Sequence, residues 1–338
     1  MTQIRKRISF EFFKEQSDKI IETYEPFRRT WHGLHIYATD GDQYELPRSD
    51  DILDHGYRGY PCVNETETHY PHMYVVHCYD VLGGVTKEFL YSNKNREMHL
   101  AMEIASVLEP KSLTLYDRLF FCRDLMRAHQ LSGSLFLARL KDSELALPEV
   151  IEFTNSSRRN RSFEFEGTVV QLVKVKNPRT NAYSVFATNL PRSGFKNQEI
   201  DKLYALRWEV ETANRDMSHT LKVEQWHSRF LNGILQEIYA TLWLMNQSRI
   251  QMAKELNKKC SLESLFDYAK SNFKLVADFV IDNLVDLVKK RHCRFNRGLR
   301  HILKISVENR TRRSRSYPRQ TKYSRKAYPS ASTVPRVK

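Results

Sequence analysis

Residues 33–140 alternate between short apolar runs and amphipathic stretches, in an order that few folds can accommodate. The order is a strand at 33–39, hairpin strands at 73–81 and 85–91, a helix at 95–109, a strand at 112–116, a helix at 121–130 and a strand at 134–139. Strands joined by crossover helices predict an α/β fold, in which a mixed sheet has helices on its faces.

The pattern of the chain changes after residue 140. Four β-rich segments separated by polar turns follow, at 150–153, 162–166, 168–175 and 183–188. From residue 197 the periodicity is helical, and it predicts helices over 197–222, 230–256 and 261–290. We therefore divide the chain into an N-terminal helical segment (1–32), the first part of a core (33–140), a β-rich insertion (141–192), the second part of the core with C-terminal helices (193–290) and a basic tail (291–338).

The net positive charge of the chain lies at its C-terminal end. Residues 289–338 hold 17 Lys and Arg and a single acid, which gives +16, whereas the other residues hold 37 basic and 39 acidic groups, which gives −2. A near-neutral body with a basic tail favours contact with a polyanion, because each neutralised phosphate releases counterions. A solvated tail that keeps the protein soluble is the alternative. The arginine-rich run at 310–315, followed by basic residues interleaved with tyrosines, favours nucleic acid.

Neither a membrane nor a secreted location is predicted. No run of 18 apolar residues occurs, and the N-terminus lacks the apolar core of a signal peptide. The five cysteines are scattered, odd in number and without a C-x-x-C pair, which indicates reduced thiols rather than a disulfide framework. We expect a cytoplasmic protein.

Two carboxylates follow predicted strands of the core. Asp40 comes directly after 33–39, and Asp117 comes directly after 112–116. Aspartate at the end of a strand is common as a turn former or a helix cap, so each alone is a weak signal for catalysis. Asp42 is a rival to Asp40 for the first position.

A third carboxylate, Glu211, lies in the predicted helix 197–222. In a helical projection one stripe, separate from the apolar stripe, contains Tyr204, Arg207, Glu211, Arg215 and Lys222. Viewed alone, this stripe is more typical of a solvated face on which the glutamate pairs with the arginines four residues before and after it. The neighbouring Trp208 is expected to be half-buried and to anchor the helix, with stacking on a base as the alternative.

In combination these residues resemble the transposases of the insertion-sequence-four group. Tyr204, Arg207 and Glu211 have the Y-x2-R-x3-E spacing of the group's Y-R-E-K signature. Ala38-Thr-Asp-Gly-Asp-x3-Leu46-Pro47 is similar to its first-aspartate motif A-x-D-G-T-x3-L-P, and Leu115-Tyr-Asp-Arg118-Leu-Phe is similar to its second motif, D-R-x-F after an apolar strand. Arg319 resembles the arginine of the group's basic P-R tail, so the likeness covers most of residues 33–330.

The resemblance implies an RNase H-like core with a β insertion between the second and third acids. It implies that Asp40, Asp117 and Glu211 hold two Mg²⁺ or Mn²⁺ ions, because hard oxygen ligands suit these cations. The DNA-binding residues that it implies are Tyr204 and Arg207, and we expect Lys222 or Arg215 to supply the phosphate contact of the signature lysine. The partners would be the terminal inverted repeats of a bacterial element, target DNA and a second copy of the chain. The expected reaction is nicking and strand transfer close to the nucleoid, for which members of the group commonly use a hairpin intermediate.

Two departures from the group's pattern leave an alternative open. Ser218 stands where the signature has lysine, and Asp42 stands where the first motif has threonine. Only 39 residues precede Asp40, whereas members of the group commonly have a longer DNA-binding region there. A catalytically weakened derivative that regulates by binding DNA is therefore the alternative function. A junction resolvase is disfavoured by the long β-rich block.

Overall fold

The computed structural model describes residues 2–62, 65–140, 147–176, 183–191, 195–256, 273–289, 291–306 and 333–335. Contacts divide the chain into two compact units. One consists of residues 1–22, 44–73 and 219–338, and the other of residues 23–43 and 74–218. Within the described ranges, no helix has both the length and the apolar character that a membrane crossing requires.

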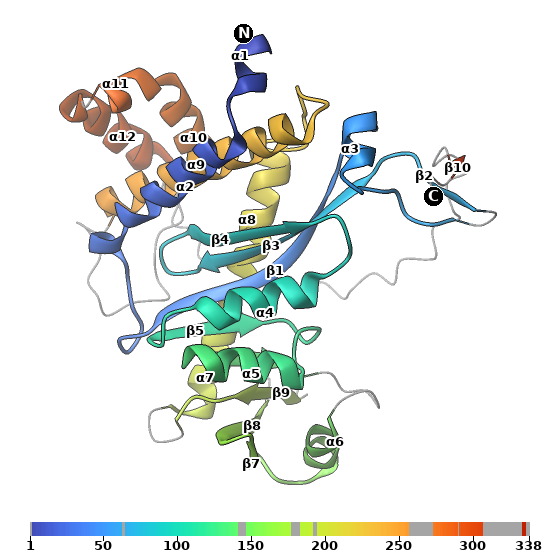
Figure 1. Cartoon of the computed structure of the whole chain (residues 1–338). Helices are drawn as coiled ribbons and strands as arrows, with labels where there is room; N and C mark the ends of the chain where they lie inside the picture. The colour runs from blue at the N-terminus through green and yellow to red at the C-terminus, as the bar shows by residue number, and fades with distance from the viewer. Residues whose placement is uncertain are drawn as a thin grey trace. The chain divides into compact units, whose positions relative to one another are not determined.

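The predicted mixed sheet is present and has eight strands (Figure 1). Its order is β4 (Val85–Ser92), β3 (His72–Asp80), β1 (His35–Glu45), β5 (Ser112–Tyr116), β6 (Leu135–Arg139), β9 (Tyr183–Thr188), β8 (Thr168–Lys176) and β7 (Asn160–Phe165). Strands β1, β5 and β6 run parallel, whereas β3 with β4 and the series β6, β9, β8 and β7 pair antiparallel.

Residue types explain why the centre of the sheet forms. All five residues of β5 are buried, as expected of a parallel strand covered on both faces. The predicted hairpin of β3 and β4 turns at Gly84, whose φ of 78° is a backbone conformation that glycine adopts without strain.

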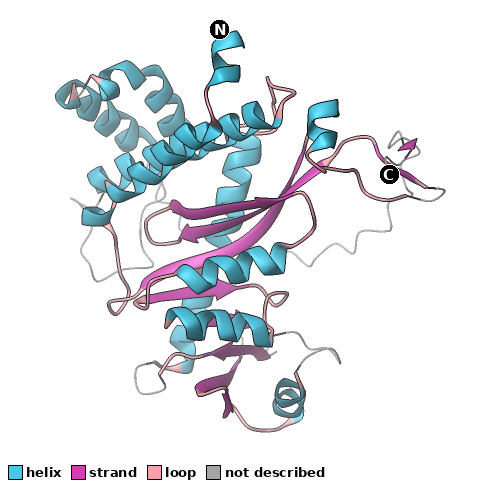
Figure 2. Cartoon of the chain, viewed as in Figure 1, coloured by secondary structure: helices cyan, strands magenta, loops and turns pink. Residues whose placement is uncertain are grey.

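Helices cover both faces of this sheet (Figures 1 and 2). On one face, α4 (Glu97–Val107) and α5 (Arg123–Ser132) bury Ile104 and Leu125 against sheet residues such as Phe136. On the other face lie α7 (Asn197–Ala205) and α8 (Trp208–Arg215). The predicted helices at 95–109 and 121–130 are thus confirmed with small shifts of their ends.

The β-rich block after residue 140 differs in one element from the prediction. Residues 150–153 were expected in a strand, but they lie in α6 (Pro148–Asn155). Pro148 occupies the first turn, where the missing N–H costs nothing, and Val150 and Phe153 are buried at a helical spacing of three. The remaining segments form β7, β8 and β9, which extend the sheet beyond β6.

The other unit is mainly helical. Its helices are α1 (Thr2–Arg7), α2 (Phe10–Glu22), α3 (Asp50–Asp54), α9 (Leu231–Leu256), α10 (Phe273–Asp282), α11 (Leu284–Val288) and α12 (His292–Ser306). Helix α2 packs along α9, and α1 is tied to α9 by an ion pair of 2.7 Å between Arg5 and Glu237. A short ribbon pairs β2 (Thr66–Thr68) with β10 (Thr333–Pro335).

The predicted helix 230–256 is confirmed as α9, whereas 261–290 is not one helix. Its described part is divided into α10 and α11, with Asn283 between them. The first part of the basic tail forms α12. The arginine-rich run at 310–315 lies outside the described residues.

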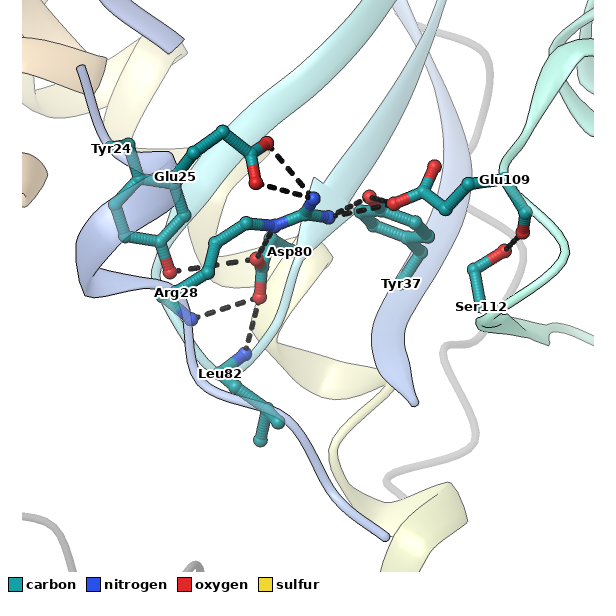
Figure 3. A network of polar contacts seen from close by, with 9 residues as sticks. Tyr24, Glu25, Arg28, Tyr37, Asp80, Leu82, Glu109 and Ser112 are labelled. Carbon is teal, nitrogen blue, oxygen red and sulfur yellow. Dashed lines mark hydrogen bonds and ion pairs between the residues drawn. The ribbon is translucent and has the colours of Figure 1, made fainter. Parts of the chain in front are cut away.

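A network of polar side chains lies at the beginning of β1 (Figure 3). The guanidinium of Arg28 lies 3.0 Å from Glu109, 3.5 Å from Asp80 and 2.9 Å from Glu25, and it also donates to the Tyr37 hydroxyl. That hydroxyl donates to Glu109 over 2.6 Å. The network attaches the short helix η1 (Glu25–Phe27) to β1 and β3.

Candidate active site

The register of β1 and β5 brings the first two acids to one edge of the sheet. The last residue pair in this parallel ladder is Thr39 with Tyr116, and Asp40 and Asp117 are the next residue of each chain segment. Both acids are partly buried. The sequence prediction that the two carboxylates follow neighbouring strands agrees with this register.

One detail of the prediction is wrong: Asp40 lies inside a strand and not at its end. Strand β1 continues to Glu45, and its last residue but one, Tyr44, is fully buried. Asp42 therefore belongs to the same strand, two residues beyond Asp40. Its carboxylate accepts a hydrogen bond of 3.5 Å from the Ser218 hydroxyl. The two positions that depart from the group's motifs are thus in contact with each other.

The third acid is carried by α8, after a break that the sequence pattern did not predict. Residues 197–222 form α7, then α8, then the π-helix η3 (Asp216–Thr220). At the break, Leu206 and Arg207 donate backbone hydrogen bonds three residues back, to Leu203 and Tyr204, which tightens the turn. Beyond the break, Arg207 and Glu211 keep their helical spacing of four residues.

The guanidinium of Arg207 joins the first strand to this helix. It donates a short hydrogen bond to Oε1 of Glu211, and its Nη1 lies 3.9 Å from Oδ2 of Asp40. The side chain is almost fully buried, with 6% of its surface exposed, whereas Asp40 and Glu211 expose 21% and 36%. The pairing of Glu211 with Arg207 that the sequence left open is therefore present.

The remaining residues of the predicted stripe do not share one face. Tyr204 is buried, and its ring packs on Phe186 with centroids 5.0 Å apart. Burial raises the pKa of Tyr204 to about 12; Arg207 opposes this shift and Asp117 adds to it. Arg215 is exposed, and the described contacts include none between it and Glu211. Lys222 lies beyond the helix with a φ of 53°, because the π-turn ends the helix first.

Trp208 was expected to be half-buried, and the structure contradicts this. The side chain is 56% exposed, so it does not anchor the helix in the core. The Arg207 guanidinium lies over the indole, 5.2 Å from the ring centroid. Arg207 therefore has an aromatic neighbour at the surface as well as two carboxylates on its buried side.

A fourth carboxylate, Glu97, belongs to this group and was missed in the sequence. It lies in the first turn of α4, against Gly41, where a Cβ atom would overlap with the Glu97 carboxyl group. Burial raises the pKa of Glu97, and the charge of Asp117 raises it further. An acid in the first turn of a helix is common for reasons of the helix dipole, so the sequence offered no signal to single it out.

These carboxylates act on one another electrostatically. Burial raises the pKa of Asp40 to about 7; Arg207 opposes this shift, while the charges of Glu211 and Glu97 add to it. Oxygen ligands with excess negative charge are the donors that Mg²⁺ and Mn²⁺ prefer, so the donor set fits a hard divalent cation. In the described part of the chain, however, no three His, Cys, Asp or Glu side chains lie close enough together to hold a metal ion as they stand. Arg207 supplies the positive charge instead.

Three comparisons with known proteins relate this arrangement to others. A family model described as "Transposase DDE domain" matches residues 31–247. A protein described as "Putative transposase InsZ" from Escherichia coli (strain K12) is 27% identical over an alignment of 136 residues. The match covers 37% of this chain and 43% of that protein. The chain thus spans less than half the length of this curated relative.

A solved structure, of the piggyBac transposase synaptic complex with hairpin DNA, shows a distant likeness. Its TM-score is 0.47 at 12% identity, and the match covers 82% of this chain and 58% of that chain. The likeness is too low to support any statement about the residues of the present site.

Proposed function

Because this chain belongs to the transposase DDE domain family, we propose that it is a cut-and-paste transposase of the insertion-sequence-four group. It nicks DNA at the ends of an insertion sequence and joins the freed end to target DNA. The observation that carries this proposal is that Asp40 and Asp117 directly follow paired residues of β1 and β5, while Arg207 contacts both Asp40 and Glu211.

The strand order supports an RNase H-like core. Its five strands would be β4, β3, β1, β5 and β6, of which β1, β5 and β6 are parallel, with helices on both faces. Strands β7 to β9 would be the insertion between the second and third acids. The five-part division of the chain given by the sequence stays a proposal beside the two compact units.

Asp40, Asp117 and Glu211 would hold two divalent ions. When bound, such ions supply activation of the attacking oxygen and stabilisation of the leaving 3′ oxygen. Water attacks the phosphorus, the bond to the 3′ oxygen breaks, and a 3′ hydroxyl is freed. That hydroxyl then attacks a second phosphodiester, on the opposite strand to form a hairpin or on target DNA. In the first step a water oxygen replaces the 3′ ester oxygen and leaves a 5′ phosphate, and in the second the freed 3′ hydroxyl forms a new ester and displaces the 3′ oxygen of the attacked phosphodiester.

The cationic side chains hold the DNA in this proposal. Arg207 presents a planar fork that matches the oxygens of a phosphate, and Tyr204 supports it from the sheet side. Arg215 and Lys222 would contact the backbone further from the scissile bond. The partners are the terminal inverted repeats, target DNA and a second copy of the chain, in a bacterial cytoplasm and on its nucleoid.

A DNA-binding regulator without catalytic activity is the second candidate. It is favoured by the contact of Arg207 with two of the acids and by Ser218 in the place of the signature lysine. Such a protein would bind terminal repeats and compete with active copies of the transposase.

The test uses a plasmid that carries the genomic DNA flanking the gene. We expect Mg²⁺- or Mn²⁺-dependent nicking by the full chain, abolished by Asp40→Asn, Asp117→Asn and Glu211→Gln. Glu209→Gln removes an acid of the same helix and serves as the matched control. Specific binding of the DNA without nicking in either metal would replace the enzyme with the regulator, and absence of both would reject the two candidates.

A further inference from the structure

The cationic side chain of Arg207 lies between two acids of the proposed metal site. Arg207 is 5% exposed overall, and its guanidinium contacts carboxylate oxygens of both Asp40 and Glu211. Its Nε atom is buried and has no hydrogen-bond partner. The guanidinium is thus held mainly by its ion pairs with the two carboxylates, and its Nε donor makes no hydrogen bond.

The position of Arg207 is specific, as Arg215 shows. Both arginines are four residues from Glu211, one before it and one after it. Arg207 turns toward Asp40 and is buried, whereas Arg215 is exposed at the end of α8. An ordinary surface pair would be available to either arginine and would contribute little.

A guanidinium and a divalent ion repel each other and compete for the charge of the same two carboxylates. Buried carboxylates need a counter-charge, because an unpaired charge in a poorly solvated place is costly. In the protein without ions, Arg207 supplies that charge to Asp40 and Glu211. The described acids are not gathered into a group of three around a common point, which is consistent with a guanidinium taking the place of an ion.

We propose that Arg207 is a displaceable counter-ion of the metal site, which leaves Asp40 and Glu211 when a divalent ion binds. This inference rests on the metal site of the proposed function and adds a competition to it. The released guanidinium keeps its aromatic neighbour Trp208, which is largely exposed, so it moves toward the surface from which DNA is reached. Ion binding thereby prepares Arg207 to bind a phosphate.

The competition predicts a gain of ion affinity on removal of the arginine. We expect Arg207→Gln to bind Mg²⁺ about tenfold more tightly than the wild-type chain in calorimetric titration without DNA, since the ion no longer displaces a charged partner. Arg215→Gln is the matched control and should keep the wild-type affinity. Asp40→Asn should lose the binding.

The outcomes of the titration distinguish failure of the proposed metal site from failure of the proposed displacement of Arg207. Binding that depends on Asp40 but is unchanged or weaker in Arg207→Gln would overturn the displacement and leave the metal site intact. No binding in the wild-type chain or in Arg207→Gln would reject the metal site and the displacement together. An equal gain in Arg215→Gln would show a general charge effect and also overturn the displacement.

Two further readouts guard against a variant that folds poorly. Arg207→Gln should have a lower Tm than the wild type in EDTA and a larger rise of Tm with Mg²⁺, because its two acids lack a counter-charge until the ion arrives. In the wild-type chain, Mg²⁺ should change the tryptophan fluorescence, and the change should be absent in Trp208→Phe and in Arg207→Gln. A Tm rise equal to that of the wild type, or a change of fluorescence that persists in Arg207→Gln, contradicts displacement.

Discussion

At the scale of single residues, the charge at the proposed metal site depends on side chains that no short motif contains. Glu97 approaches the backbone of β1 because Gly41 leaves room for its carboxyl group. It acts on Asp40, whose pKa it helps to raise, and it is itself affected by Asp117. Glycine at position 41 thus has a packing role, because a side chain there would overlap with Glu97.

Glu97 should strengthen the binding of a divalent ion. Replacement by glutamine removes one negative charge beside Asp40 and Asp117, so Glu97→Gln should lower Mg²⁺ affinity about three- to tenfold at the effective dielectric of a partly buried site. Glu103→Gln is the matched control, since Glu103 is exposed on the same helix. Calorimetric titration measures both. Equal affinities of the two variants would remove Glu97 from the ion's surroundings.

The contact of Ser218 with Asp42 changes what a restored lysine would do. In Ser218→Lys alone, the ammonium group would be captured by Asp42, whose carboxylate already accepts a hydrogen bond from this position. Nicking by Ser218→Lys should therefore stay at the wild-type level, whereas Asp42→Thr with Ser218→Lys should raise it severalfold, as one phosphate contact is gained. A gain in the single variant that equals the gain in the double variant would contradict the capture.

At the scale of secondary-structure elements, the order of strands and helices in the first part of the sheet could be predicted, whereas α6, β2 and the divisions of the later helices could not. Alternation and periodicity locate β1, β3, β4, β5 and β6 because each of these strands buries an apolar face. The break of residues 197–222 into α7, α8 and a π-turn has no such signature: Leu203, Val210, Ala213 and Met217 are buried as a continuous helix would require. The hydrogen-bond shift that moves Lys222 off the stripe depends on tertiary contacts, which a helical projection does not contain.

The network around Arg28 should make the sheet sensitive to acid. Burial alone would raise the pKa of Glu109, but hydrogen bonds from Tyr37 and Arg28 and the arginine's charge lower it below its ordinary value. A lowered carboxyl pKa contributes stability above the unfolded-state value, and that stability is lost as the pH falls through the folded-state pKa.

Glu109→Gln should therefore lower the free energy of unfolding by about 1.5–3 kcal/mol at pH 7, the value of a hydrogen bond to a charged group. The difference from the wild type should shrink as the pH falls below the ordinary glutamate pKa of about 4.3 and through the lower pKa of folded Glu109, because the wild-type side chain then loses its charge. Denaturant unfolding at several pH values measures it. Glu25→Gln is the control within the network; Glu25 is 48% exposed, so its effect should stay small. A loss for Glu109→Gln that does not depend on pH would exclude the ionic contribution.

At the scale of the whole molecule, the net positive charge lies in residues 289–338, which follow the proposed catalytic residues in the sequence. If the C-terminal arginines bind DNA, replacement of Arg312, Arg313 and Arg315 by glutamine should weaken binding to all sequences alike. The slope of log affinity against log salt should fall by up to about three units, since each phosphate contact contributes about 0.9. Filter binding over a range of salt concentrations measures the slope, with Asp40→Asn as a control that retains it. An unchanged slope would favour the solvated tail.

The packing of α2 on α9 has a consequence for synthesis on the ribosome. Roughly 200 residues separate the end of α2 from the start of α9, and at 5–20 residues per second its partner appears on the order of ten to forty seconds later. During that interval the apolar side of α2 has no permanent cover, and stalled chains shorter than about 230 residues should be cut by protease within residues 10–22 more readily than the finished chain. Chains that end early should therefore be degraded faster than the finished chain.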